Sequence, residues 1–241
     1  MRTIYAHRGM SSLAPENTLS AFKLCADYRV GWFECDIDIL HDGTIVVSHD
    51  STLDRCTNRS GLLFDINKQD LADIDAGSWF SHDYLEEPIP TLDQLIEVMN
   101  RYKLNANIEI KSCESNVQAS RDLLDGLNAA LEQLAPEREY IISSFNPILL
   151  AEFKKIRPEA PIACLFENQT LNDDWHVIME WTGAQYIHPQ NDGLTREQVK
   201  MFKDRGYKVN VWTVNAKDRA NELFNWGVDG IFTDFAQNFS R

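Results

Sequence analysis

The strongest constraint on the fold is a regular alternation of short β-like runs with helix-like segments along nearly the whole 241-residue chain. The apolar patterns predict eight principal strands, near residues 4, 33, 107, 140, 162, 186, 210 and 230. Helical spacing of apolar residues predicts helices over 16–28, 92–99, 117–131, 147–156, 175–181, 195–205 and 216–226. Eight strand–helix units in about 250 residues favour an α/β fold of the (β/α)₈ TIM-barrel type. The alternative is an open doubly wound sheet, and its dinucleotide-binding form is weakened because no G-x-G-x-x-G follows the first strand.

One segment interrupts this alternation. Asp42-Gly43 predicts a hairpin turn between the second strand and a short strand over 45–47. Residues 51–91 then carry turn residues and only one helix-like piece, over 68–74. Connections this long are unusual in a compact domain and are often functional. We therefore predict one domain over 1–241, with 51–91 as a small inserted subdomain or lid after the second strand region.

Charged side chains repeat with strand periodicity in the second and third strands. Glu34, Asp36 and Asp38 are spaced i, i+2, i+4 and share one face of a strand, while Glu109 and Lys111 repeat the spacing on the next strand. Carboxylates crowded on one face repel, and a divalent cation that prefers oxygen ligands removes the conflict. Pairing with basic side chains, Lys111 among them, explains the same pattern. The spacing alone supports the two interpretations equally.

Further polar residues fall at strand ends, where sites form in barrels of this kind. His7 ends the first strand and precedes Arg8, and His49 ends the short strand after the hairpin. Two imidazoles near one cation would suit acid–base work at neutral pH. His188 ends the sixth strand, and there we favour a structural role. Trp212 falls on the seventh predicted strand, over 208–214, and Asp234 follows the eighth.

The composition limits the classes of molecule that the chain is expected to bind. The formal charge of −14 and the pI near 4.8 argue against non-specific binding of nucleic acid and against stable membrane association, but they allow a small phosphorylated substrate. Five cysteines without a C-x-x-C spacing predict free thiols, Cys113 among them. Without an apolar leader or a run of about 18 apolar residues, we predict a cytoplasmic protein. Neither the His-x-His of a zinc hydrolase barrel nor the G-x-S-x-G of a serine hydrolase is present.

Several short motifs, in order and spacing, resemble the glycerophosphodiester phosphodiesterase family, and in particular its cytosolic bacterial members. The early ones are His7-Arg8-Gly9, Pro15-Glu16-Asn17-Thr18, Glu34-Cys35-Asp36, Asp42-Gly43, His49-Asp50 and Leu53-Asp54-Arg55. The later ones are the runs 75–80, 90–92, 107–111, 212–215 and 227–234. The resemblance spans residues 4 to about 235, nearly the whole chain. The family usually has Thr where this chain has Cys56, a departure that bears on substrate choice because it falls within 51–91.

The resemblance implies an enzyme that hydrolyses glycerophosphodiesters such as glycerophosphocholine, glycerophosphoethanolamine and glycerophosphoglycerol to glycerol 3-phosphate and an alcohol. It implies one divalent cation, Mg²⁺ or Ca²⁺ with Mn²⁺ as a third option, held by Glu34, Asp36 and Glu109. It also implies that His7 and His49 form the acid–base pair. Arg8 and Lys111 would hold the phosphate, and Trp212 would pack against the glycerol.

Two alternatives stay open at this point. One is a phosphodiesterase acting on lysophospholipids, which would need an apolar patch near the site. The other is a non-catalytic barrel that binds phosphodiesters, which a missing site residue would favour, yet all five residues of the metal and acid–base sets are present. The sequence does not choose the metal, the head group, the first nucleophile (water or a glycerol hydroxyl) or the oligomeric state.

Overall fold

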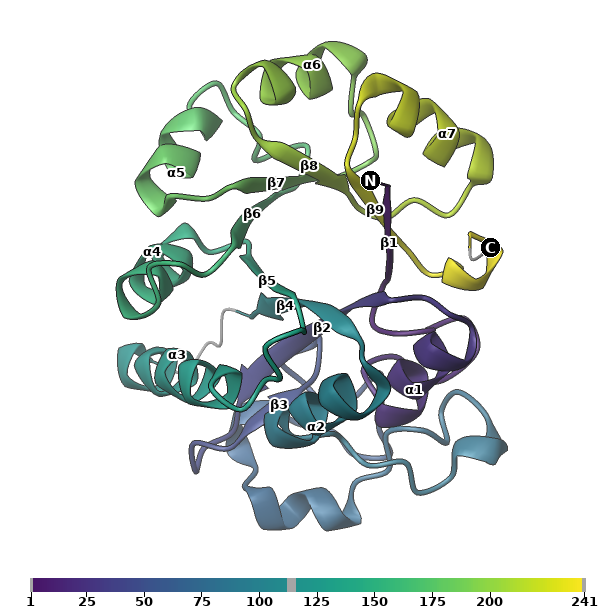
Figure 1. Cartoon of the computed structure of the whole chain (residues 1–241). Helices are drawn as coiled ribbons and strands as arrows, with labels where there is room; N and C mark the ends of the chain where they lie inside the picture. Colours follow the sequence, from purple (N-terminus) through teal and green to yellow (C-terminus); the bar gives the residue numbers. More distant parts are fainter. Residues whose placement is uncertain (1, 112–115, 240–241) are drawn as a thin grey trace.

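The computed structural model describes residues 2–111 and 116–239, and within them eight parallel strands close into a barrel ringed by helices (Figure 1). The barrel strands are β1 (Thr3–Ala6), β2 (Trp32–Ile39), β4 (Asn105–Ile110), β5 (Tyr140–Ser144), β6 (Ile162–Phe166), β7 (Tyr186–Pro189), β8 (Lys208–Val211) and β9 (Gly230–Thr233). The ring closes at β1, where Tyr5 pairs with Trp32 of β2 on one side and with Phe232 of β9 on the other. The predicted TIM barrel is confirmed.

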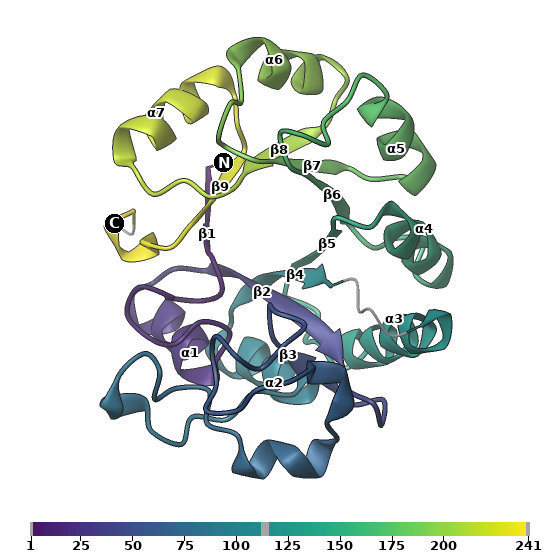
Figure 2. The ribbon, with the colours of Figure 1, turned by 180° about the vertical axis from the view of Figure 1, so that it is seen from behind.

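The helices lie outside the barrel, one after nearly every strand, and Figure 2 shows the same ring from behind. They are α1 (Leu19–Asp27), α2 (Leu92–Tyr102), α3 (Val117–Leu131), α4 (Pro147–Ile156), α5 (Trp175–Thr182), α6 (Arg196–Asp204) and α7 (Lys217–Trp226). Side chains that accept hydrogen bonds from the first helical turn fix several starts, as Thr18, Thr91 and Thr195 do for α1, α2 and α6. Left-handed glycines end α5 and α7, at Gly183 and Gly227.

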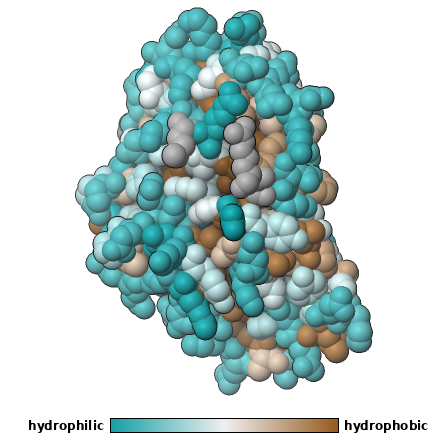
Figure 3. All heavy atoms as spheres, turned by 45° about the vertical axis from the view of Figure 1, so that its right-hand side comes forward, coloured by the Kyte–Doolittle hydropathy of each residue, from teal (hydrophilic) through white to brown (hydrophobic). Residues whose placement is uncertain are grey.

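The main apolar core fills the layer between the strands and these helices, and a second, smaller cluster lines the barrel interior. In the interior cluster Tyr5 stacks on Phe232, with ring centroids 4.6 Å apart. The outer surface is mostly hydrophilic on the face shown in Figure 3, as a net charge of −14 requires. Among the helices of the described residues, none has both the length and the hydropathy needed to cross a membrane.

The hairpin after β2 forms as predicted, with β3 (Ile45–Val47) antiparallel to β2. Residues 48–91 then run beside α1 and α2 at one side of the barrel (Figures 1 and 2). They contain the 3₁₀ helices η1 (Leu63–Asp65), η2 (Lys68–Asp73) and η3 (His82–Tyr84), so the helix-like piece predicted over 68–74 is a 3₁₀ helix. A separate cluster of buried apolar residues, including Leu53, Leu63 and Leu71, packs this segment against Leu40 and Val46 of the hairpin region.

Two strand ends differ from the prediction. The seventh barrel strand, β8, ends at Val211 rather than Val214, because its neighbour β7 ends at Pro189 and leaves Trp212 a single bridge, to Gln190. Similarly, β4 ends at Ile110, so Lys111 follows the strand rather than lying on it. A fourth 3₁₀ helix, η4 (Ala236–Asn238), follows β9 near the end of the described residues.

Candidate active site

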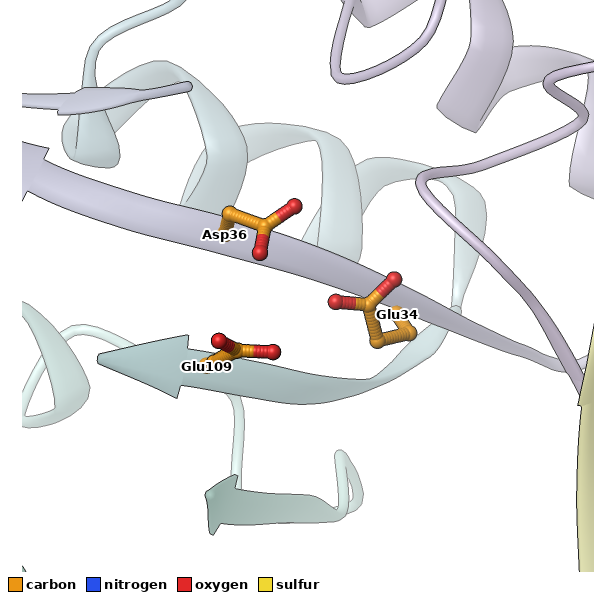
Figure 4. A group of neighbouring side chains, drawn as sticks. All are labelled: Glu34, Asp36 and Glu109. Carbon is orange, nitrogen blue, oxygen red and sulfur yellow. The ribbon is translucent and has the colours of Figure 1, made fainter. Parts of the chain in front are cut away.

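Three buried carboxylates meet at the C-terminal end of the barrel (Figure 4). Glu34 and Asp36 come from β2 and Glu109 from β4, and one oxygen of each lies within 4.8 Å of the others. The register explains the meeting, because Asp36 and Glu109 are paired across the two parallel strands. Asp38 does not join them, since it lies opposite Val46 of β3, beyond the end of β4. Its carboxylate accepts the backbone N–H of Ile39 at 2.8 Å.

The three carboxylates do not ionise alike. Burial, together with the charges of Asp36 and Glu109, raises the pKa of Glu34 well above its usual range. Burial and the charge of Asp36 raise the pKa of Glu109 to about 7. The pKa of Asp36 is lowered despite burial, because Lys111, His49 and Arg8 surround it with cationic or hydrogen-bonding groups. Asp36 is therefore the most readily ionised of the three, and the two glutamates hold their protons more strongly than usual.

Two basic side chains lie against the carboxylates. Lys111 Nζ lies 2.8 Å from Glu109 Oε1 and 3.5 Å from Asp36 Oδ1. Arg8 Nε lies 3.7 Å from Asp36 Oδ2, and the Arg8 backbone N–H donates to Glu34 Oε2 at 2.8 Å. The acidic residues are thus paired with basic side chains in part, which is the alternative to a metal that the sequence pattern allowed. Two cations cannot neutralise three carboxylates, so this pairing does not exclude a metal.

Two buried amides complete the floor of the site. Asn17 Nδ2 donates to Asp36 Oδ2 at 2.9 Å, which fixes the orientation of that carboxylate. Asn107 lies beside Glu34 in the strand register and donates from Nδ2 to Ser143 Oγ at 2.8 Å. Its Oδ1 is buried without a hydrogen-bond partner among the described residues. Neither amide was predicted as a site residue, although Asn107 follows the same alternation as Glu109.

His7 stands where β1 ends, at the rim of the carboxylate group. Its Nδ1 lies 2.7 Å from Asp234 Oδ1, and its Nε2 lies 3.9 Å from Glu34 Oε2. A carboxylate on Nδ1 favours the tautomer that keeps Nε2 free to accept a proton. Asp234 is held in turn by Asn215, whose Nδ2 donates to Oδ2 at 2.7 Å. His7, on the first strand, is thus oriented by residues that follow the last two strands of the barrel, Asn215 and Asp234.

His49 has the same kind of partner. Its Nδ1 lies 2.7 Å from Asp50 Oδ1, which leaves Nε2 unengaged by that carboxylate. Burial lowers the pKa of His49, and the charge of Asp36 offsets this only in part. Both imidazoles line one cavity together with Arg8 and the carboxylates.

The opposite wall of this cavity is apolar. It is formed by Phe145, Leu165, Trp212 and Phe232. Trp212 is fixed from behind, because its Nε1–H donates to the backbone oxygen of His188 at 2.8 Å, and its ring meets Phe145 edge-on at 5.5 Å. The strand-end rule found Trp212, whereas Phe145 and Leu165 carried no signal that distinguished them from core residues.

The remaining candidates have structural settings. His188 is fully buried, and its Nε2 lies 3.0 Å from Asn210 Nδ2, beneath the cavity floor. Cys35 is buried on the side of β2 that packs against the helices, as alternation predicts. The thiols of Cys25, Cys35, Cys56 and Cys164 are free, and Cys113 lies outside the described residues.

The donor set fits a divalent metal ion. Only oxygen atoms converge from Glu34, Asp36 and Glu109, which is the ligand type that Mg²⁺, Ca²⁺ and Mn²⁺ prefer. Asp36 Oδ1 is buried without a hydrogen-bond partner among the described residues. Buried polar atoms are rarely left in that condition unless a ligand completes them. The site can therefore hold a divalent cation.

Comparison with known proteins agrees with this geometry. The model of the glycerophosphoryl diester phosphodiesterase family matches residues 7–238. A glycerophosphodiester phosphodiesterase of Caldanaerobacter subterraneus subsp. tengcongensis is 35% identical over 231 residues, which are 96% of this chain and 93% of the relative. One from Bacillus subtilis (strain 168) is 30% identical over 250 residues, covering 98% of this chain and 84% of the relative.

Among solved structures, the chain is similar to a phosphodiesterase of Oleispira antarctica in complex with its product sn-glycerol-3-phosphate. The TM-score is 0.93 at 32% identity, with 98% of this chain and 94% of that chain covered. The chain belongs to the glycerophosphoryl diester phosphodiesterase family. It is accordingly a phosphoric diester hydrolase, as its motifs predicted.

Proposed function

We propose that the chain hydrolyses glycerophosphodiesters to glycerol 3-phosphate and an alcohol, with one divalent cation held by Glu34, Asp36 and Glu109. The observation that carries this proposal is the joint presence, in one cavity, of this carboxylate group and of two imidazoles each oriented by its own carboxylate. Family membership supports the substrate class, and the Oleispira antarctica relative was solved with the same product.

When bound, the cation supplies Lewis-acid neutralisation of charge that develops on the phosphate oxygens. Arg8 and Lys111 already lie beside the carboxylates, 3.7 Å and 3.5 Å from Asp36. We assign them to the phosphate, because a substrate anion competes for the same two cations that the carboxylates engage here. A guanidinium and an ammonium group together favour a phosphodiester over a neutral ligand.

The two histidines take opposite proton-transfer roles. His7 Nε2 accepts the proton of the nucleophile, because Asp234 holds its Nδ1–H tautomer. His49 donates a proton to the leaving alcohol. Burial keeps its imidazole neutral in the substrate-free protein, and the negative charge of a bound phosphodiester favours the protonated form.

The apolar wall receives the carbon atoms of the glycerol. Trp212 is its largest side chain, and its orientation is fixed by the hydrogen bond to His188. Lysophospholipids remain the alternative substrates, because Phe145 and Leu165 extend the wall beyond Trp212 and line a further cavity. Comparing the turnover of lysophosphatidylcholine with that of glycerophosphocholine separates the two, and the proposal expects the second to be faster.

The test of the proposal is release of glycerol 3-phosphate from glycerophosphocholine, glycerophosphoethanolamine and glycerophosphoglycerol, with Mg²⁺, Ca²⁺ or Mn²⁺ and with EDTA. His7→Ala and His49→Ala should each lower kcat by about 10² to 10⁴. Activity that survives both EDTA and the two histidine variants would sink the scheme. Binding without turnover in every metal would favour the non-catalytic alternative.

The choice of metal follows from ligand distances. Oxygens about 2.1 Å from the ion would indicate Mg²⁺, and oxygens about 2.4 Å away would indicate Ca²⁺. Residues 51–91 we propose as an inserted subdomain of the single barrel domain, on the basis of their separate apolar cluster. The cytoplasmic location stays a prediction.

A further inference from the structure

A single arginine of the 48–91 segment connects the two sides of the active site. Arg55 Nε and Nη2 donate to Asp50 at 2.6 Å and 3.1 Å. Its Nη1 and Nη2 donate to Glu16 at 2.8 Å and 2.7 Å. Each acceptor is already the partner of a site residue, since Asp50 holds His49 and Glu16 accepts from Arg8 Nη1 at 2.8 Å. An unbroken ionic chain therefore runs from one proposed catalytic group to one proposed phosphate ligand.

The charges explain why the guanidinium stands there. Asp50 and Glu16 come from different loops, and both must face the site to hold their partners. A planar guanidinium can serve both carboxylates at once with paired N–H groups, which an ammonium group cannot do. The hydrogen bonds from Arg55 lower the pKa of both acids, in spite of the burial of each, and that of Asp50 falls to about 2. Both acceptors therefore favour their charged forms.

The same segment makes two further contacts, one with the loop between β1 and α1 and one with the first turn of α1. Tyr84 donates its hydroxyl to the backbone oxygen of Leu13 at 2.9 Å. Glu87 accepts from the backbone and side chain of Ser20, at 3.1 Å and 2.7 Å. This loop carries Arg8 and Asn17, two of the residues that contact Asp36. The contacts of the segment therefore converge on the loop that supplies one wall of the site.

We propose that Arg55 is a positioning residue for the phosphodiesterase reaction, which aligns His49 through Asp50 and Arg8 through Glu16. This assignment rests on the proposed function of His49 and Arg8. It gives residues 48–91 a definite task, since the segment holds the β1–α1 loop and the imidazole of His49 in one fixed relation.

The test compares Arg55→Met and Arg55→Lys with Arg59→Met. Arg59 lies in the same segment, is exposed and has no ion pair among the described residues. Arg59→Met therefore removes the same charge without disturbing the ion pairs that run from His49 to Arg8. Arg55→Met should lower kcat and raise KM together, with a loss in kcat/KM between about tenfold and a hundredfold. Arg55→Lys should recover part of this loss. In a further variant, Arg55→Ala, added guanidinium at millimolar concentration should restore activity. Arg59→Met should match the wild type.

A double-mutant cycle separates positioning from general damage. If Arg55 acts through Asp50, then Asp50→Asn should cost far less in the Arg55→Met background than in the wild type. Effects that simply multiply, or an Arg55→Met enzyme with wild-type kcat and KM, would overturn the inference. The inference would also be overturned if guanidinium restored no activity and if the loss of kcat/KM matched a smaller folded fraction of the variant, as judged from its melting temperature. A wild-type protein inactive on every glycerophosphodiester would instead count against the proposed function.

Discussion

Two groups of buried polar side chains lie on the barrel strands, and they differ in charge. On β2 and β4, Glu34, Asp36 and Glu109 crowd like charges together and leave an oxygen of Asp36 without a hydrogen bond. On β7 and β8, His188 and Asn210 form a neutral pair, in which His188 Nδ1 is also buried without a hydrogen-bond partner among the described residues. Burial of polar groups alone therefore does not identify a site. The site is where burial leaves a charge conflict that only a ligand can resolve.

The largest effect on metal binding and catalysis is expected when one of the three crowded carboxylates is replaced by a neutral group. Glu34→Gln keeps the shape of the side chain and deletes one negative charge, so metal binding and catalysis should fall by about a thousandfold or more. The metal-free protein should not lose stability, because the raised pKa of Glu34 already favours a neutral group at this position. Melting curves with EDTA, beside kcat/KM with saturating metal, check both parts. A variant that is both active and less stable would break the distinction between the two groups.

The neutral pair should show the opposite behaviour. Burial lowers the pKa of His188 to about 3, below the value near 6.5 of an unfolded chain. Between these values the folded protein binds fewer protons than the unfolded one, so this contribution to stability is complete above pH 6.5 and is lost as the pH falls. The loss amounts to about 3 kcal/mol at pH 4. His188→Gln should flatten the pH dependence of the free energy of unfolding by that amount, as denaturant titrations from pH 4 to 7 would reveal.

An intermediate effect is expected at Asn17, which touches the charged group but carries no charge. Loss of its hydrogen bond to Asp36 in Asn17→Ala should weaken metal binding between about tenfold and a hundredfold. Asn17 also has a positive φ of 58°, which an alanine adopts less readily, so part of the loss will appear as stability. Asn17→Gly relieves the backbone while still lacking the amide. It should recover stability but not metal affinity.

The smallest effect is a dependence of metal affinity on pH. A cation must displace the proton from Glu109, whose pKa is raised to about 7. Affinity should therefore rise with pH, by about tenfold per pH unit for each proton displaced, and should keep rising above pH 7 until Glu34, whose pKa is also raised, has lost its proton. Calorimetric titrations of EDTA-treated protein with Mg²⁺ or Ca²⁺ between pH 5.5 and 8.5 measure this. A flat profile would mean that Glu109 is already ionised without metal.

Local periodicity predicted the barrel and the acidic face of its second strand, whereas the choice of Glu34, Asp36 and Glu109 as a set came from the family resemblance. Alternation placed Glu34 and Asp36 on one face of a strand, and adjacency of parallel strands brought Glu109 beside them. Strand-end position identified His7 before any contact was known. The errors in the strand ends near Lys111 and Trp212 arose because a strand ends where its neighbour ends, which a single run of residues does not record.

The partners of these residues were harder to predict for a physical reason. Asp234 and His7 are 227 positions apart in the sequence, and Arg55 and Glu16 are 39 positions apart. Such pairs have no periodic signature, because they form only when the closed ring and the 48–91 segment bring distant loops together. Glu16, Asp50 and Arg55 each fall in a motif that carries the family resemblance, but nothing in the order of residues indicated that Arg55 joins the other two.

The junction between β1 and β9 has a consequence for how activity is acquired during synthesis. Both histidines, all three carboxylates and both cations lie between His7 and Lys111, so a growing chain contains them before the second half of the barrel is made. Asp234, which orients His7, is added only after β9, the last strand of the barrel. Catalysis in this protein should therefore begin only when the final strand has docked, which makes turnover a direct report of a completed barrel.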